Sequence, residues 1–230
     1  KKRKTDFENF ILGRLAPEDR NYLVELDKTP SLFQLIEKWL ERIPFIQEEH
    51  FDFWKEFKRS VSEMLKADKK FIEDNLTLPK EQKLVQLEGL EATKETFHSL
   101  FDSKKFQSLR ENGKYRLSQK ATLGALFILL YRDEPILYQP FKILNSLMDI
   151  DENFIAWRHR HALMALRMLG TKMGTGGSSG HDYLKTAAEE NKIFSDLFNL
   201  STFLIPRSKL PELPVQIKKE LNFNFTGGSK

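Results

Sequence analysis

Apolar side chains recur every three or four residues over long stretches of this chain, and that spacing predicts helices. Residues 30–40 form one such stretch, with an apolar face made by Leu32, Leu35, Ile36, Trp39 and Leu40. Residues 51–75 form a second, with Phe53, Trp54, Phe57, Val61 and Leu65 on one face. No segment reads as a strand, and the low Gly and Pro content also favours helices. We therefore expect an all-α fold.

Further helices are expected at residues 81–101, 103–111, 117–131, 139–148, 151–170, 182–190 and 192–204. Ser118 is a suitable N-cap, and Asp149 or Asp151 would cap the helix at 151–170. Gly170 would end that helix. The expected organisation is a polar linker with a short helix (residues 1–29), a helical domain (30–207) and a C-terminal tail (208–230).

The composition excludes several classes of function. With a net charge of +4 and interspersed acidic and basic residues, the chain lacks the concentrated basic face of a nucleic-acid-binding protein. The absence of cysteine excludes disulfides, thiolate metal sites and cysteine nucleophiles. This absence fits a cytoplasmic protein, which we expect. No apolar run approaches the ~20 residues of a membrane span. The chain begins Lys1-Lys2-Arg3-Lys4, with neither a signal peptide nor an initiator Met, which fits an internal fragment.

The expected helix at residues 151–170 places one of its two histidines on an apolar stripe. At 3.6 residues per turn, the stripe contains Phe154, Trp157, His161, Met164, Ala165 and Met168. His159 projects away from it. Two interpretations of His161 stay open: a core histidine bonded to a carbonyl or carboxylate, and an axial haem ligand. A zinc site would need three or four ligands, and the chain has no H-x-x-x-H or H-E-x-x-H pair.

A glycine-rich loop follows this helix, with four glycines among residues 174–180. Glycines allow the backbone to approach a ligand closely, and the N–H groups, Thr175 and two serines could bind a carboxylate or phosphate. The loop is neither a Walker A loop nor a dinucleotide fingerprint, because it lacks the closing Lys-Ser/Thr pair and no strand precedes it. A flexible loop between helices is the alternative.

Many short runs, in the same order, resemble the C-terminal part of tryptophan 2,3-dioxygenases of the animal type. They extend from about residue 30 to residue 207. The most specific are residues 174–180 and 199–202; the others include Phe51-Asp52-Phe53-Trp54, Arg116-Leu117-Ser118, Tyr131-Arg132-Asp133-Glu134-Pro135, Leu147-Met148-Asp149-Ile150-Asp151, Arg167-Met168-Leu169-Gly170 and Ile205-Pro206-Arg207.

The resemblance implies a helical haem-dioxygenase bundle that carries haem b and forms a homotetramer built as a dimer of dimers. Members of the family add both atoms of O2 across the indole C2–C3 bond of L-tryptophan, which gives N-formylkynurenine. On this sequence the proximal haem ligand falls on His161. Trp157 would lie beside the haem edge, and Met164 would pack on the porphyrin.

The same resemblance assigns substrate positions. Thr175 matches the loop threonine that contacts the polar end of the amino acid, with Gly174 and Gly176 on either side of it. Trp39, Arg42 and Pro44 match a peripheral tryptophan-binding patch, although an ordinary helix end explains them as well.

The distal histidine, aromatic pocket and carboxylate-binding arginine of the family belong to an N-terminal third that we do not find in this sequence. His50 is not the distal histidine, because its neighbours align with a later Phe-x-Phe-Trp element. We therefore assign no catalytic residue. Two interpretations remain: a large piece of a dioxygenase whose N-terminal segment is separate, or a non-catalytic haem-binding or assembly fragment.

Overall fold

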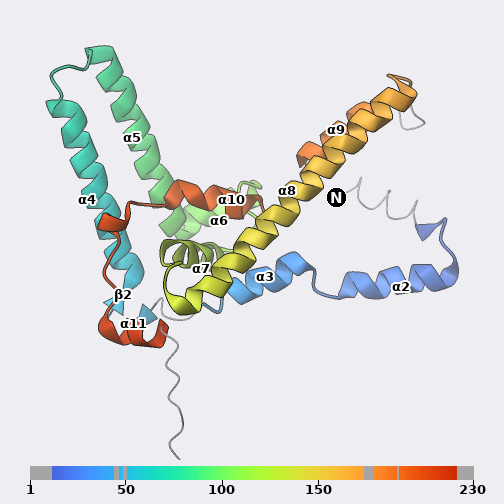
Figure 1. The fold of residues 1–230 in the computed structure, drawn as a ribbon, viewed down its shortest axis with the longest axis horizontal. Coiled ribbons are helices and arrows are strands. Elements are labelled where there is room, and N and C mark those ends of the chain that lie inside the picture. The colour runs from blue at the N-terminus through green and yellow to red at the C-terminus, as the bar shows by residue number, and fades with distance from the viewer. Residues whose placement is uncertain (1–11, 44–46, 49–50, 174–178, 191, 222–230) are drawn as a thin grey trace, which may run out of the picture.

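The computed structural model describes residues 12–43, 47–48, 51–173, 179–190 and 192–221, and these residues confirm the all-α expectation. A small central body carries two long helical arms, and a further helix lies apart from both (Figure 1). One arm is α4 (Phe53–Asp74) with α5 (Lys80–Phe101), and the other is α8 (Pro135–Leu169) with α9 (Gly180–Glu190).

Helix α7 (Gln119–Leu130) is the centre of the body, and most of its side chains are buried. Its N-cap is Ser118, as expected, whose hydroxyl accepts the N–H of Ala121 at 3.1 Å. Helix α3 (Leu32–Leu40) crosses α7 so closely that a Cβ on Gly124 would lie 2.4 Å from the carbonyl oxygen of Leu40. Glycine is therefore required at this crossing. Helix α6 (Ser103–Glu111) and the short α10 (Ser195–Asn199) complete the layer around α7.

An aromatic cluster joins the α4–α5 arm to the body. Phe53, at the start of α4, contacts the rings of Trp54, Phe57, Phe127 and Tyr131 at centroid distances of 4.7–5.9 Å. Such clusters bury large apolar areas, and their edge-to-face geometry adds to packing. The base of the arm is therefore fixed, whereas its outer end projects from the body (Figure 1).

The α8–α9 arm corrects our expectation of two helices at 139–148 and 151–170. Helix α8 runs unbroken from Pro135 to Leu169, with Pro140 inside it. Neither Asp149 nor Asp151 is an N-cap. Asp151 is fully buried, and its carboxylate accepts the backbone N–H groups of Ile193 and Phe194 at 3.0–3.1 Å. A carboxylate that resembled a local cap thus makes a long-range contact. Gly170 does end α8, with a φ of 62°.

Three other segments differ from expectation. Residues Gln47–Glu48 and Phe51–Asp52 form a small antiparallel hairpin, although no strand was expected. The helix expected at 192–204 is shorter, because α10 ends at Asn199 and a 3-10 turn covers Leu200–Phe203. Part of the expected tail packs on the body. It contains a 3-10 turn (Arg207–Lys209) and α11 (Val215–Leu221), and it buries Leu213, Ile217 and Leu221.

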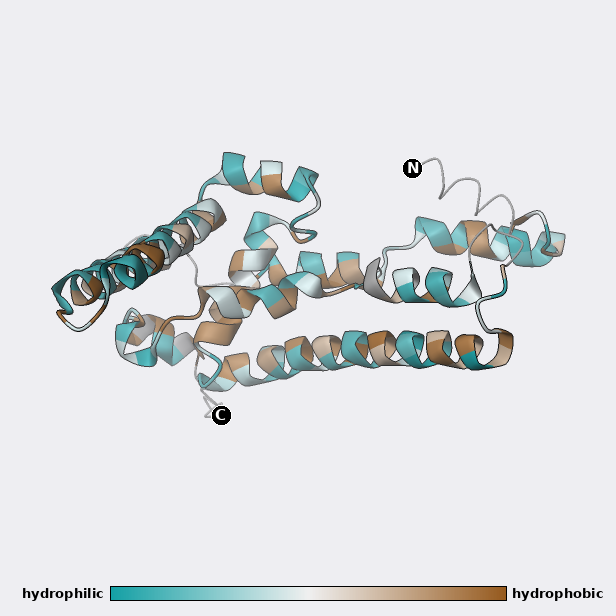
Figure 2. Cartoon of the chain, turned by 90° about the horizontal axis from the view of Figure 1, so that it is seen from above, coloured by the Kyte–Doolittle hydropathy of each residue, from teal (hydrophilic) through white to brown (hydrophobic). Residues whose placement is uncertain are grey.

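Tyr131 holds this C-terminal segment against the body. Its hydroxyl donates to the carbonyl oxygen of Pro211 at 2.6 Å, and burial raises the pKa of the phenol above its ordinary value. Apolar and polar segments alternate along the exposed helices (Figure 2). Within the ranges given above, no helix is both long and apolar enough to cross a membrane.

Candidate functional site

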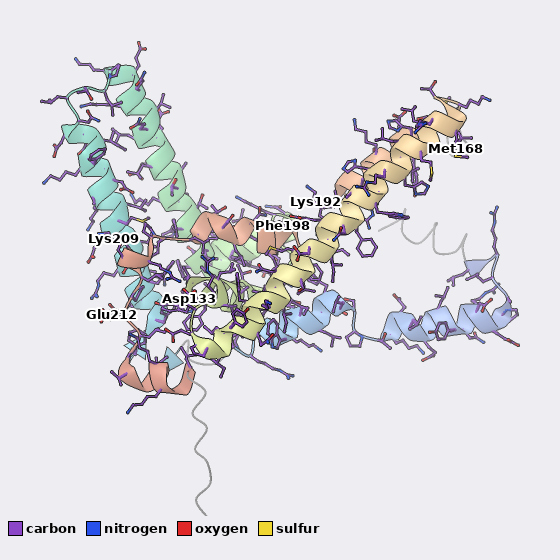
Figure 3. The ribbon with its side chains drawn as sticks, in the orientation of Figure 1. Asp133, Met168, Lys192, Phe198, Lys209 and Glu212 are labelled. Carbon is purple, nitrogen blue, oxygen red and sulfur yellow. The ribbon has the colours of Figure 1, made fainter. Side chains whose placement is uncertain are left out.

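The apolar stripe expected around His161 is present on α8. Trp157 and His161 are one turn apart on the same side, with ring centroids 5.5 Å apart and an interplanar angle of 53°. Phe154, Met164 and Met168 continue the stripe at helical spacing. Met168 lies near the outer end of the arm (Figure 3).

The stripe is largely uncovered in the described chain, which was not expected for a histidine in apolar surroundings. Trp157 is 59% exposed and Met164 is 54% exposed, while His161 is half-buried. Ala162 is buried at 2% exposure, and the Nδ1 atom of His181 in α9 lies 3.1 Å from its carbonyl oxygen. Since successive helical residues are about 100° apart, α9 covers the side of α8 next to the stripe. The face around His161 is therefore free to contact another molecule or segment.

The two histidines of α8 are not equivalent in the structure. His159 is exposed, whereas His161 lies between Trp157 and Met164. Among the residues that the structure describes, no three His, Cys, Asp or Glu side chains gather closely enough to bind a bare metal ion. A metal held through His161 would therefore need most of its ligands from a prosthetic group.

Thr175, Gly174 and Gly176, the expected substrate residues, lie outside the described residues. The segments on either side of them are described. Met173 and Ser179 form an antiparallel bridge, which brings the two ends of the loop together. The hydroxyl of Ser179 accepts the N–H of Asp182 at 3.1 Å and donates to its carboxylate at 2.6 Å. This exchange caps the first turn of α9.

Two buried carboxylates hold the segment that follows α9, and the spacing of the residues predicted neither role. Asp151 receives the N–H groups of Ile193 and Phe194, as described above. Asp196 receives the N–H groups of Arg116 and Leu117, both at 2.7 Å. The guanidinium of Arg116 donates to the carbonyl oxygens of Lys192 and Ile193 at 3.0 and 2.9 Å.

These bonds join α8, the residues that lead into α7, and the segment 192–196. Lys192 and Phe198, near this junction, are labelled in Figure 3. The side chains of Arg116, Asp151 and Asp196 come from runs that carry the family resemblance: residues 116–118, residues 147–151, and residues 196–202, which include the specific run 199–202. The resemblance could have indicated that these runs meet, but the spacing of the residues could not.

The expected peripheral patch is described only in part, because Pro44 lies outside the described residues. Trp39 is half-buried and Arg42 is exposed at the end of α3. The backbone N–H of Arg42 donates to the carbonyl oxygen of Trp39 at 3.1 Å, so the two residues share the last turn. Their role in binding tryptophan remains a prediction.

Comparison with known proteins identifies the family. Residues 5–204 match the family described as tryptophan 2,3-dioxygenase. The chain belongs to this family. It is 48% identical to the tryptophan 2,3-dioxygenase of Bdellovibrio bacteriovorus over 211 residues, which cover 92% of this chain and 59% of that protein. The protein of the same name from Alteromonas mediterranea is also 48% identical, over 96% of this chain and 61% of that protein.

Tryptophan 2,3-dioxygenase B of Danio rerio is 44% identical over 88% of this chain and 49% of that protein. The resemblance to the family is thus confirmed, and it extends to bacterial as well as animal members. The chain spans about three fifths of the length of the bacterial relatives and about half that of the zebrafish relative.

Proposed function

We propose that this chain provides the proximal side of the haem site in a tryptophan 2,3-dioxygenase. The reaction would be the addition of both atoms of O2 to L-tryptophan, which gives N-formylkynurenine. Family membership supports the reaction, and the exposed stripe around His161 is the observation that carries the site.

The residues of the stripe suit haem b. A porphyrin is a large, mostly apolar group, and histidine is a common protein ligand of its iron. His161 would be this ligand, while Trp157 and Met164 would contact the ring. The bound haem would supply the iron chemistry that activates O2. The chain would hold and orient that group and exclude water from it.

The loop after α8 would bind the substrate. Thr175, with Gly174 and Gly176, would hold the polar end of L-tryptophan through its hydroxyl and through backbone N–H groups. The bridge between Met173 and Ser179 supports this role, because it fixes the ends of the loop beside the end of α8. Asp151, Asp196 and Arg116 would act as positioning residues, since they hold the segment after α9 against the body.

The working protein would be a cytoplasmic homotetramer built as a dimer of dimers. The distal groups of the family would come from a further N-terminal segment, either in the same polypeptide or as a separate piece. The alternative is a chain that binds haem or assists assembly without catalysis. The extent of the family match, residues 5–204, favours the enzyme.

The test is turnover with the distal segment supplied. The chain, supplemented with haem and a separately produced N-terminal segment of a bacterial relative, is assayed for N-formylkynurenine. Product formation supports the proposal, and haem binding without any turnover supports the non-catalytic alternative. Thr175→Ala should weaken tryptophan binding and leave haem bound. Thr186→Ala, an exposed threonine on α9, is the matched control.

A further inference from the structure

Helix α2 (Pro17–Lys28) has an apolar side that nothing in the described chain covers. None of its residues is buried. Tyr22, Leu23 and Leu26 lie on one side at helical spacing and are 66%, 40% and 44% exposed. An isolated helix of 12 residues is marginal in water. Helix α2 therefore needs a surface on which to pack.

The charges of α2 restrict the choice of that surface. The helix contains Glu18, Asp19, Glu25 and Asp27 against Arg20 and Lys28. By helical geometry, Glu18 and Glu25 border the apolar side on one edge and Asp27 borders it on the other, while Asp19 lies within that side near its N-terminal end. Lys28 lies beyond Glu25 and pairs with it at 2.5 Å. A partner should therefore have an apolar centre with a basic rim.

The groove between α4 and α5 has this composition. It encloses about 630 Å³, and its apolar lining is Val61, Leu65, Leu90, Phe97 and Phe101. Its basic lining is Lys58, Lys66, Lys69, Lys94 and His98, whereas only Glu91 and Asp102 are acidic.

Both acids of the groove are already engaged. Glu91 pairs with Lys94 at 2.9 Å, and Asp102 accepts the backbone N–H groups of Lys104 and Lys105. Among the bases, Lys94 is the partner of Glu91 and Lys69 lies 3.9 Å from Glu73. Within the described residues, no acid lies within salt-bridge distance of Lys58 or Lys66. The groove is thus open, apolar at its centre and short of negative charge.

We propose that α2 of one copy of this chain packs in the α4–α5 groove of a second copy. The dimensions agree: α2 and the part of α4 that lines the groove, residues 58–69, are each about 18 Å long. An amphipathic helix laid in a groove is a common mode of recognition. The acidic edges of α2 would face the basic rim.

The contact has to form between copies. Helix α2 and the α4–α5 arm project from opposite ends of the molecule (Figure 1). Only residues 29–31 connect α2 to α3, and three residues reach about 10 Å at most. A reciprocal exchange, in which each copy gives its α2 and receives the other, closes a two-fold dimer and leaves no free groove.

Cysteine cross-linking tests this contact directly, because the chain has no cysteine of its own. One tagged chain carries Leu26→Cys, on the apolar side of α2, and a differently tagged chain carries Ser62→Cys, in the groove. The two are mixed and oxidised. We expect a disulfide-linked pair that contains both tags, because each α2 docks in the other chain. Ala67→Cys, exposed on the opposite side of α4, replaces Ser62→Cys as the control and should give roughly tenfold less product.

Charge reversal provides the second arm of the test. Two charge-reversed forms of each cysteine variant are made. The first carries Glu18→Lys and Glu25→Lys on α2, and the second carries Lys66→Glu and Lys69→Glu in the groove. Either reversal in both chains should abolish the cross-link. It should return when one α2-reversed chain is mixed with one groove-reversed chain, because both contacts are then complementary. Lys70→Glu, which does not line the groove, should have little effect. The proposal would be overturned if no cross-link formed, or if Ala67→Cys gave as much product as Ser62→Cys. It would also be overturned if the charge reversals left the yield of cross-link unchanged.

Discussion

The rings of Trp157 and His161 lie 5.5 Å apart on one face of α8, and that face is open. If His161 ligates haem, Trp157 is placed to pack on the edge of the porphyrin. Trp157→Ala should weaken haem retention at least about fivefold, because aromatic contacts contribute ~1 kcal/mol beyond area burial. Leu163→Ala, an exposed apolar change on the opposite side of α8, is the control. Equal losses in a haem titration of both variants would contradict a specific role for Trp157.

Asp151 should be the carboxylate on which the base of the α8–α9 arm most depends. Asp151→Ala would leave two buried backbone N–H groups without a partner and should lower the free energy of unfolding by about 3 kcal/mol. Asp151→Asn keeps one acceptor oxygen and should lower it less. Asp149→Ala, an exposed change on the same helix, should stay within about 0.5 kcal/mol of the unmodified chain. Urea unfolding of the three variants measures the differences, and similar values for Asp151→Ala and Asp149→Ala would refute the assignment.

The crossing of α3 and α7 depends on Gly124. An alanine there would place its Cβ against the backbone of Leu40, which cannot move without shifting α3, so Gly124→Ala should cost about 2–3 kcal/mol. Gly89 provides the matched control, because a Cβ there meets no atom within 4 Å. Gly89→Ala should raise stability by about 1 kcal/mol, since alanine favours a helix interior over glycine. Thermal unfolding should show opposite shifts for the two changes.

Asp102 should make the stability of α6 depend on pH. Hydrogen bonds from the backbone N–H groups of Lys105 and Lys104 lower the pKa of this carboxyl below its ordinary value of 3.8. Because the folded-state pKa is lowered, the ionised carboxylate stabilises the fold, and this stabilisation is fully present above pH 3.8. The stabilisation is lost as the pH falls through the folded-state pKa. Asp102→Ala should therefore lower stability at neutral pH, and the difference should shrink in acid. Asp68→Ala, an exposed change within α4, should show no such trend in urea unfolding. A constant difference at all pH values would contradict the cap.

The local spacing of apolar residues and the capping residues predicted most helices, but not the contacts that join one helix to another. The apolar spacing of α3, α4 and α7 and the cap at Ser118 were readable, because each depends on residues within one or two turns. The continuity of α8 was not, since Asp151 has the local appearance of a cap and its partners are 42 and 43 residues away. The C-terminal segment was taken for a tail because its packing depends on distant groups such as Tyr131.

The candidate site was predictable to a similar extent. Helical spacing separated His161 from His159, and the structure places Trp157 beside His161. The spacing could not show that this face would be open, because exposure depends on what packs against it. For the same reason the exposed side of α2 and the α4–α5 groove emerged only from the structure.

The most direct test of the proposed site is the absorption spectrum of the haem-supplemented chain, with and without an N-terminal segment of a relative. We expect a sharp Soret band that shifts when CO binds the reduced iron, retained in His159→Ala and lost in His161→Ala. Loss in both variants, or a band that survives His161→Ala, would contradict the assignment of His161 as the haem ligand.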